Sequence, residues 1–203
     1  MLIKEAKEIT GGLSKPSKMP GPAFNIPTTA CIIGTILRNK KGSTCEFCYA
    51  HNRGRYRFPN VKAALERRLA ALQDPRWVSG MITLIKGRPV FRWHDSGDIQ
   101  SAQHLKNIFE ICKATPDTKH WLPTREAQFL KYLDPDVVPK NLKIVFSDHM
   151  NDQARGVSWW PYTSGVTTKR GAATCPAPKQ GNKCQSCRRC WDRDVKRVIY
   201  GKH

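Results

Sequence analysis

"RPVFRWHDSGDIQSAQHLKNIFEICKATPDTKHWLPT", residues 88–124, is the stretch that decides the fold. Its first part (88–95) has the aromatic and β-branched character of a strand, and apolar residues recur at helical spacing over 102–113. Its last part (119–124) is again strand-like. A strand, a helix and a strand in this order form a parallel pair joined by a right-handed crossover. We therefore predict an α/β fold built on a parallel sheet.

The same alternation continues on both sides of this unit. A helix is predicted from Asn60, which can serve as its N-cap, to a stop at Pro75, because apolar residues recur on one face between them. We also predict buried strands over 28–37 and 141–148 and a short helix over 125–133.

Composition divides the chain into three parts. The first, residues 1–27, is rich in Lys, Pro and Gly and is expected to be an arm that docks on the body. Residues 28–150 carry the strand and helix periodicity and should form the α/β core. Residues 151–203 lose that periodicity and are predicted to be a basic, cysteine-rich, metal-binding C-terminal extension.

Polar residues collect where three of the predicted strands end, at 94–98, 124–125 and 147–149. Because ligands bind at the carboxyl edge of parallel sheets, we expect these groups to share one pocket. His94, Arg125 and His149 are the candidate catalytic residues. The alternatives are that the histidines are hydrogen-bonded packing residues and that Arg125 forms a surface salt bridge.

Eight cysteines in 203 residues indicate metal. The N-terminus lacks the apolar core of a signal peptide, and no segment has the apolar length of a membrane span. We therefore expect a cytoplasmic protein with no membrane partner. In a reducing compartment cysteines are better candidates for metal ligands than for disulfides.

One cysteine set lies near the C-terminus and consists of Cys175, Cys184, Cys187 and Cys190. Thiolates separated by two residues on a tight turn can reach one metal centre together. The segment around them has little else to bury, so we predict that the metal itself folds it. Zinc and a [4Fe–4S] cluster both fit the set, and the tight run of its last three members favours iron–sulfur.

Cys31, Cys45 and Cys48 form the other candidate set. Three thiolates can hold a four-iron cluster and leave one iron without a protein ligand, where a small molecule can bind. The alternative is that Cys31 is a buried core thiol and that Cys45 and Cys48 are a redox pair. Cys112 lies on the inward face of a predicted helix and is expected to pack in the core.

"CEFCYA" (45–50), with an aromatic residue before its second cysteine, resembles the end of the radical S-adenosylmethionine signature. The chain as a whole is similar to a phage-encoded, radical-SAM-like family known as gene product eighty-eight. The blocks that carry this similarity are "ACIIGTIL" (30–37), "GSTCEFCYAHNRGRYRF" (42–58), "RWHDSGDI" (92–99), "LPTREAQF" (122–129) and "CQSCRRCW" (184–191). Cys31 precedes Cys45 by 14 residues, farther than in the usual motif, and the usual "GGE" stretch has no literal copy.

The resemblance implies a partial TIM-like barrel and a [4Fe–4S] cluster whose open iron binds S-adenosylmethionine. An enzyme of this kind also needs an electron donor. The cofactor-binding candidates at matching positions are Phe47, Tyr49, Ser96, Gly97, Asp98 and Arg125. Asp98 would accept from the cofactor's ammonium group. Its alternative role is the N-cap of the following helix, for which Ser101 competes.

The formal net charge of +19 favours a nucleic acid or a nucleotide as partner. The candidate contacts mix arginines with aromatic residues, as single-strand binding surfaces do. They are Arg53, Arg55, Tyr56, Arg57, Arg188 and Arg189. The alternative is a solvated basic face that balances cluster charge. The sequence thus leaves three hypotheses: a radical-SAM-like enzyme, an iron–sulfur or zinc protein that binds nucleic acid or a host factor without catalysis, and a two-cluster electron-transfer protein.

Overall fold

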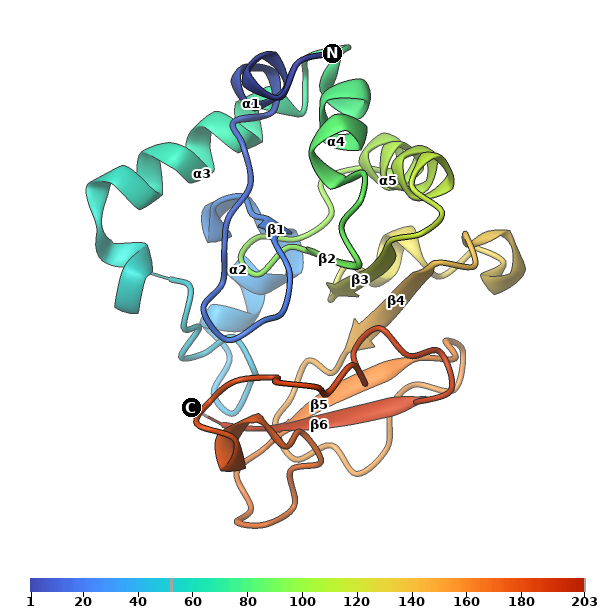
Figure 1. Ribbon diagram of the computed structural model, residues 1–203. Helices are drawn as coiled ribbons and strands as arrows, with labels where there is room; N and C mark the ends of the chain where they lie inside the picture. Colours follow the sequence, from blue (N-terminus) through green and yellow to red (C-terminus); the bar gives the residue numbers. More distant parts are fainter. Residues whose placement is uncertain (52, 203) are drawn as a thin grey trace.

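A six-stranded parallel sheet forms the centre of the computed structural model, which describes residues 1–51 and 53–202 (Figure 1). Its strands lie side by side in the order of the sequence, from β1 to β6. They are β1 (Ala23–Phe24), β2 (Val90–Trp93), β3 (Lys119–Thr124), β4 (Leu142–Ser147), β5 (Thr163–Thr167) and β6 (Arg197–Gly201). All carboxyl ends therefore lie along one edge of the sheet, as the strand and helix alternation predicted.

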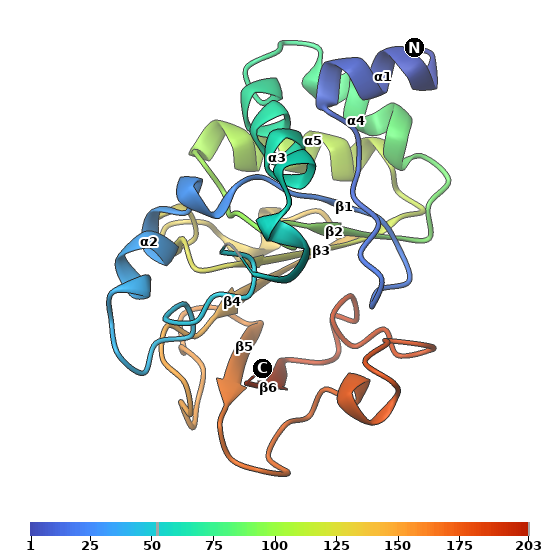
Figure 2. The same ribbon diagram turned by 90° about the vertical axis from the view of Figure 1, so that its left-hand side faces the viewer.

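The helices are α1 (Ile3–Thr10), α2 (Ile32–Arg38), α3 (Pro59–Ala71), α4 (Trp77–Ile85) and α5 (Ala102–Ala114). In both ribbon views α1, α3, α4 and α5 gather on one side of β1, β2 and β3, and the C-terminal segment lies on the other side (Figures 1 and 2). Single 3-10 turns cover Thr28–Ala30, Gly54–Arg57, Ala127–Phe129, Pro135–Val137 and Ala177–Lys179.

Strand register assigns the side chains of the sheet to its two faces. In neighbouring parallel strands, residues in register lie side by side and point the same way. One row across β2, β3 and β4 consists of Phe91, His120 and Leu142, and the adjacent row consists of Arg92, Trp121 and Lys143. The two rows project to opposite faces, so a lysine and an arginine stand within a buried sheet.

The largest buried side chains fill the layer between the sheet and the helices. Trp77 of α4 packs edge-on against Phe24 at 5.4 Å between ring centroids, and Phe91 packs against Trp93 at 4.8 Å. Burying each such ring stabilises the fold by about 1.5–3 kcal/mol. Cys112 lies in the same core, with no exposed surface.

The structure confirms the strands predicted over 88–95, 119–124 and 141–148 and the helix predicted over 102–113. The predicted strand over 28–37 is wrong, because this segment forms a 3-10 turn and the short helix α2. A short apolar run has no periodicity that separates a strand from a helix. In 125–133 the structure has only a 3-10 turn. Phe58, not Asn60, is the N-cap of α3, and Pro59 is its first residue.

The sheet extends past the predicted core, because β5 and β6 both lie beyond residue 150. Its strand order is sequential, and β1 and β6 are the two edges. The division of the chain at residues 27 and 150 stays a prediction. Within the residues that the structure describes, no helix combines the length and apolar character needed to cross a bilayer.

Candidate functional site

Two members of the first cysteine set, Cys31 and Cys45, come together at Gly34 of α2. Cys31 is the N-cap residue of this helix, and Cys45 and Cys48 lie in the loop that follows it. A Cβ atom added to Gly34 would lie 2.8 Å from Cys31 Cβ, 3.6 Å from Cys31 Sγ and 3.9 Å from Cys45 Sγ. A larger residue at Gly34 would therefore push against the Cβ atom of Cys31 and would touch both sulfur atoms.

Backbone contacts place this loop over the carboxyl edge of the sheet. The N–H of Thr44 donates to the carbonyl of His149 (2.9 Å), and Arg125 Nε donates to the Thr44 hydroxyl (2.9 Å). Oε1 of the fully buried Glu126 accepts from the N–H groups of Ile32 and Ile33, both at 3.0 Å. Cys31 is thus held from the end of β3, and the residues after β3 and β4 frame the first set.

Burial keeps the Cys31 and Cys48 thiols protonated when they are unligated. Burial raises the pKa of Cys31 far above its usual range, and Asp98 and the other two thiols add to the rise. The pKa of Cys48 is also raised by burial, against the opposing charges of Arg125 and Arg38. Deprotonated sulfur in this position therefore needs a cation beside it.

Ser96, Gly97 and Asp98 connect segments of the backbone at the same edge. The Ser96 hydroxyl donates to the carbonyl of Ile26 (2.6 Å), and a Cβ atom at Gly97, whose φ is +85°, would clash with the Ile26 side chain. Asp98 Oδ1 accepts from the N–H of Ile99 (2.8 Å), and Oδ2 accepts from the N–H of Arg125 (2.9 Å). Burial raises the pKa of Asp98 to about 6. Its predicted contact with the cofactor stays a prediction.

The helix cap is formed by Ser101, not by Asp98. The Ser101 hydroxyl accepts from the N–H of His104 (3.0 Å) at the start of α5. His94 is buried with a φ of +59°, and its ring faces that of His104 at 5.3 Å. Burial lowers the pKa of His94 well below its usual range. His149 instead lies near the first set, with Nε2 3.2 Å from the carbonyl oxygen of Arg125.

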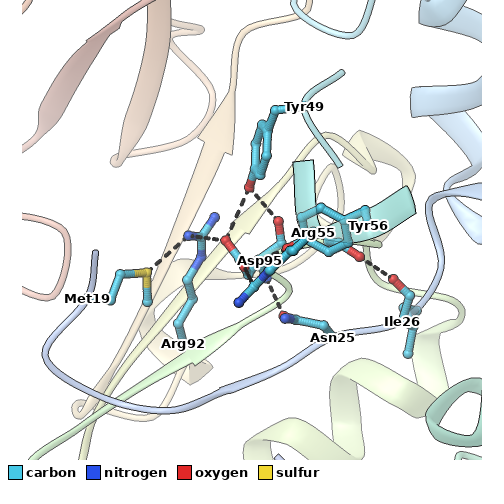
Figure 3. Close-up of polar contacts among 9 residues, drawn as sticks. Met19, Asn25, Ile26, Tyr49, Arg55, Tyr56, Arg92 and Asp95 are labelled. Atoms are coloured by element: carbon cyan, nitrogen blue, oxygen red, sulfur yellow. Dashed lines mark hydrogen bonds and ion pairs between the residues drawn. The ribbon is translucent and has the colours of Figure 1, made fainter. Parts of the chain in front are cut away.

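A buried polar network surrounds the Asp95 carboxylate, just after β2 (Figure 3). Oδ1 accepts from Arg92 (2.9 Å), and Oδ2 accepts from the Tyr56 hydroxyl (2.6 Å) and forms an ion pair with Arg55. Burial alone would raise the pKa of Asp95, but Arg92, Tyr56 and Arg55 outweigh it and hold the pKa below its usual value. Arg55 and Tyr56, predicted to contact nucleic acid, thus both contact Asp95; Tyr56 is buried, whereas the Arg55 side chain is 38% exposed.

Tyr49 joins this network to the first cysteine set. Its hydroxyl donates to the backbone carbonyl and the Oδ1 atom of Asp95, and its neighbour in the chain is Cys48 (Figure 3). The ring remains 47% exposed, although its hydroxyl is enclosed.

The second cysteine set lines one small cavity. Cys175, Cys184, Cys187 and Cys190 surround a space of about 20 Å³ together with Trp191 and Val198. Burial raises the pKa of Cys184, and it raises the pKa of Cys190 to about 11. Cys190 Sγ lies 3.2 Å from the Tyr200 hydroxyl, which belongs to β6.

A row of side chains on the sheet holds this second set. Trp121 packs edge-on against Trp191 at 5.3 Å, and the Trp191 indole N–H donates to the carbonyl of Phe91 (2.8 Å). The buried Lys143 ammonium group donates three hydrogen bonds to backbone carbonyls of the segment that follows Cys187. These are the carbonyls of Arg189 (2.9 Å), Asp192 (2.6 Å) and Val195 (2.8 Å). The cysteine-rich segment therefore has protein anchors of its own.

Arg92, the third member of the row, stands between the two cysteine sets. Its guanidinium group is paired with Asp95, stacks over Trp121 at 4.5 Å and contacts the Met19 sulfur at 3.1 Å (Figure 3). Its charge also lowers the pKa of Cys184 and of Cys190, against the larger effect of burial. One buried cation thus acts on the second set and, through Asp95, is tied to Tyr49 beside the first.

The two sets differ from a closed site for one ion. No group of three or more His, Cys, Asp or Glu side chains in residues 1–51 and 53–202 is placed to hold a single metal ion. Around one zinc ion, Zn–S bonds of about 2.3 Å bring the sulfurs within about 4 Å of each other. In a [4Fe–4S] cluster each thiolate binds a different iron, so the sulfurs stand farther apart. Thiolates are the donors that such a cluster takes.

The remaining predicted nucleic-acid residues divide between the two regions. Arg53 stacks over Phe47 at 5.4 Å, and Arg57 stacks over Phe58 at 5.3 Å. Arg188 and Arg189 instead bond to backbone carbonyls around the second set, those of Cys187 (3.0 Å) and Thr174 (2.9 Å).

Sequence reasoning missed Glu126, Lys143 and the role of Arg92. A lysine and an arginine inside two strongly apolar strands were the available signal, since such charges are buried only when they have partners. Glu126 left no comparable signal, because its partners are backbone amides 94 residues away in the chain.

Comparison with known proteins gives one match. A family model described as Gene product 88 matches residues 3–193, a range that includes both cysteine sets. No curated protein and no solved structure matches the chain.

Proposed function

The chain belongs to the Gene product 88 family, a family of phage gene products, and we propose that it is an iron–sulfur protein of the radical-SAM-like kind. In this proposal Cys31, Cys45 and Cys48 hold a [4Fe–4S] cluster with one open iron. The four C-terminal cysteines hold a second cluster. The protein would act in the cytoplasm of a bacterial host and receive electrons from an external donor.

The observation that carries the proposal is the convergence of three thiols over the carboxyl edge of a parallel sheet. Cys31 and Cys45 meet at Gly34, the charge of Cys48 acts on Cys31, and Arg125 and Arg38 stand near enough to offset negative charge at Cys48. Ligands bind at this edge in parallel α/β folds. The sequential strand order is also the order of a partial TIM-like barrel.

If S-adenosylmethionine binds, a reduced cluster supplies the electron that cleaves its sulfonium bond. The chain's own residues would bind and orient the cofactor. Arg125 can pair with a carboxylate, and the half-exposed rings of Phe47 and Tyr49 can cover an adenine. The high positive charge favours nucleic acid or a nucleotide as the molecule that is modified.

Metal and sulfide analysis after anaerobic reconstitution tests the proposal. We expect about four iron and four sulfide per site, with sulfur-to-iron charge-transfer absorbance. Cys48→Ala and Cys187→Ala should each lose about half of the iron, and the matched control Cys112→Ala should keep all of it. Zinc without iron in the wild-type protein would overturn the proposal.

A second measurement concerns the cofactor. Calorimetry should detect S-adenosylmethionine binding to the wild-type protein but not to Cys48→Ala, and reduction with dithionite should release 5′-deoxyadenosine. A protein that carries iron but neither binds nor cleaves the cofactor is not a radical-SAM-like enzyme.

One observation favours a second candidate function, a metal-stabilised nucleic-acid-binding protein without catalysis. Both carboxylate oxygens of Asp98 accept backbone N–H groups, which leaves them less free for an ammonium group of the cofactor. This alternative predicts salt-sensitive nucleic-acid binding that is the same with and without S-adenosylmethionine.

A further inference from the structure

Three large aromatic side chains near the first cysteine set stand half in solvent. Phe47 and Tyr49 flank Cys48 and are 48% and 47% exposed, and Phe58, a little farther along the chain, is 48% exposed. Isolated apolar residues at a surface are ordinary, but grouped exposed rings are typical of binding surfaces. Phe47 and Tyr49 are the immediate neighbours in the chain of Cys48, one of the proposed cluster ligands.

Cations lie over these rings. Arg53 and Lys202 both stand over the Phe47 ring, at 5.4 Å and 5.2 Å from its centroid, and Arg57 stands over Phe58 at 5.3 Å. Lys202 comes from the C-terminal end of the chain, after β6, so the arrangement is built by folding and is not a run of neighbouring residues. We call Phe47, Tyr49, Arg53 and Lys202 the aromatic–basic surface.

The charge around this surface selects an anionic occupant. In residues 42–62 Glu46 is the only acidic residue, and its carboxylate accepts from the N–H of Gly42 (2.8 Å). The whole chain carries +19, so a second copy would be repelled at low salt. A phosphate backbone has the complementary charge, and bases have faces that stack on exposed rings.

We propose that the aromatic–basic surface binds single-stranded nucleic acid and brings an unstacked base next to the first cysteine set. The modification of the base rests on the proposed function. The binding of the strand does not, since it needs no cluster. A duplex keeps its base faces inside the stack, so rings of this kind can engage only a single strand, a loop or a flipped base. Stacking tolerates any base, and the cations hold the backbone on either side.

Fluorescence anisotropy with labelled 12-nucleotide oligo(dT), oligo(U) and a hairpin duplex tests the surface, using the full chain with and without reconstituted clusters. We expect single strands to bind at least tenfold more tightly than the duplex, with an affinity that falls steeply with salt. Comparing the affinities for oligo(dT) and oligo(U) shows whether the surface prefers DNA or RNA.

Substitutions then localise the binding. Phe47→Ala should weaken single-strand binding by about tenfold, in line with the loss of one base stack. Lys202→Ala should weaken it less and reduce the slope of log affinity against log salt by about one. The matched control is Tyr132→Ala, which removes another exposed aromatic residue (88% exposed) with a cation, Lys131, 5.5 Å from its ring. This control should bind like the wild type.

Three outcomes would overturn the inference: equal binding of duplex and single strand, Phe47→Ala binding like the wild type, or Tyr132→Ala losing as much affinity as Phe47→Ala. Sedimentation that shows a Phe47-dependent dimer without oligonucleotide binding would also overturn it and assign the surface to a second copy. Iron and sulfide content measured on the same samples separates the two proposals, because Phe47→Ala leaves all seven ligand cysteines in place.

Discussion

The two cysteine sets rest on different parts of the same sheet. The first lies over the carboxyl edge, where loops meet and backbone hydrogen bonds from Thr44, Ile32 and Ile33 fix the positions of the cysteines. The second lies on a face, where it is seated on Trp121 and Lys143. An edge site can change shape by small loop movements, whereas a face site is tied to buried side chains in neighbouring strands.

This difference suits different tasks. Half-exposed rings and both signs of charge surround the first set, so a substrate can approach it. The second set lines a cavity of only about 20 Å³ beside Trp191, and its four cysteines are partly exposed. We therefore expect the edge to exchange molecules with solution and the face to serve a structural role.

The largest effect should come from removing the anchor of the second set. Lys143→Met keeps the length of the side chain but leaves the carbonyls of Arg189, Asp192 and Val195 without their donor. An unpaired buried carbonyl costs about 1–3 kcal/mol, so urea unfolding should show a loss of about 3 kcal/mol or more. Iron in the second set should be lost, and the amount retained should match that of Cys187→Ala.

Lys119→Met is the control for this substitution, because Lys119 begins β3 and is exposed. It should change the free energy of unfolding by less than about 0.5 kcal/mol. If Lys143→Met keeps both its stability and its full iron content, the sheet face does not hold the second set.

The corresponding change at the first set is Glu126→Ala. It leaves the N–H groups of Ile32 and Ile33 without an acceptor at the start of α2, and we expect a loss of about 2 kcal/mol in unfolding free energy. Because these residues follow Cys31 directly, iron in the first set should fall while iron in the second stays.

Glu126→Gln retains an amide oxygen where Oε1 accepts both N–H groups, and it should preserve most of the stability and the iron. If the glutamine and alanine variants lose equal amounts of stability and iron, then the charge of Glu126, and not its hydrogen bonds, stabilises the first set. Loss of iron from both sets in Glu126→Ala would contradict the independence of the two regions.

The parts of the fold that sequence could predict are those whose signal lies within one element. The strands at 88–95, 119–124 and 141–148 and the helix α5 have clear periodicity, and their succession is enough to predict parallel pairing. The two cysteine sets could also be found in the sequence, because the spacing between their cysteines can be read directly from it. The structure brings the members of each set together, whereas their metal content stays a prediction.

What the sequence did not reveal depends on contacts between distant segments. The segment of α2 has the composition of a strand. Its helical start is stabilised by Glu126, far along the chain, which accepts hydrogen bonds from its first backbone N–H groups. β5 consists of Thr, Ser, Gly and Val, and both β5 and β6 lie in a loop-rich stretch, so they are identified only by the pairing of β5 with β4 and of β6 with β5. The contacts of Arg55 and Tyr56 with Asp95 were not visible either, because Asp95 is 40 residues away from Arg55, and their predicted contact with nucleic acid stays a prediction.

Lowering the pH should affect the two regions differently and by degrees. His104 packs against Trp77 and His94 beneath the loop that carries Asp95 and Asp98, and burial lowers its pKa to about 4. In the unfolded chain a histidine takes up its proton near about pH 6.5. The unfolded state therefore binds more protons between these values, and stability present above pH 6.5 is lost as the pH falls towards 4.

For His104 alone the loss approaches about 1.4 kcal/mol per pH unit within this window. His104→Phe keeps an aromatic ring but cannot titrate, so urea unfolding of metal-free protein between pH 7 and pH 4.5 should show a shallower slope by up to that amount. The anchor of the second set behaves differently: burial lowers the pKa of Lys143 to about 8, so its ammonium group stays protonated throughout this range. As the pH falls, amide hydrogen exchange should therefore show that β2 and α5 lose protection before the segment held by Lys143 does. An unchanged slope in His104→Phe, or simultaneous opening of both regions, would show that edge and face form one cooperative unit.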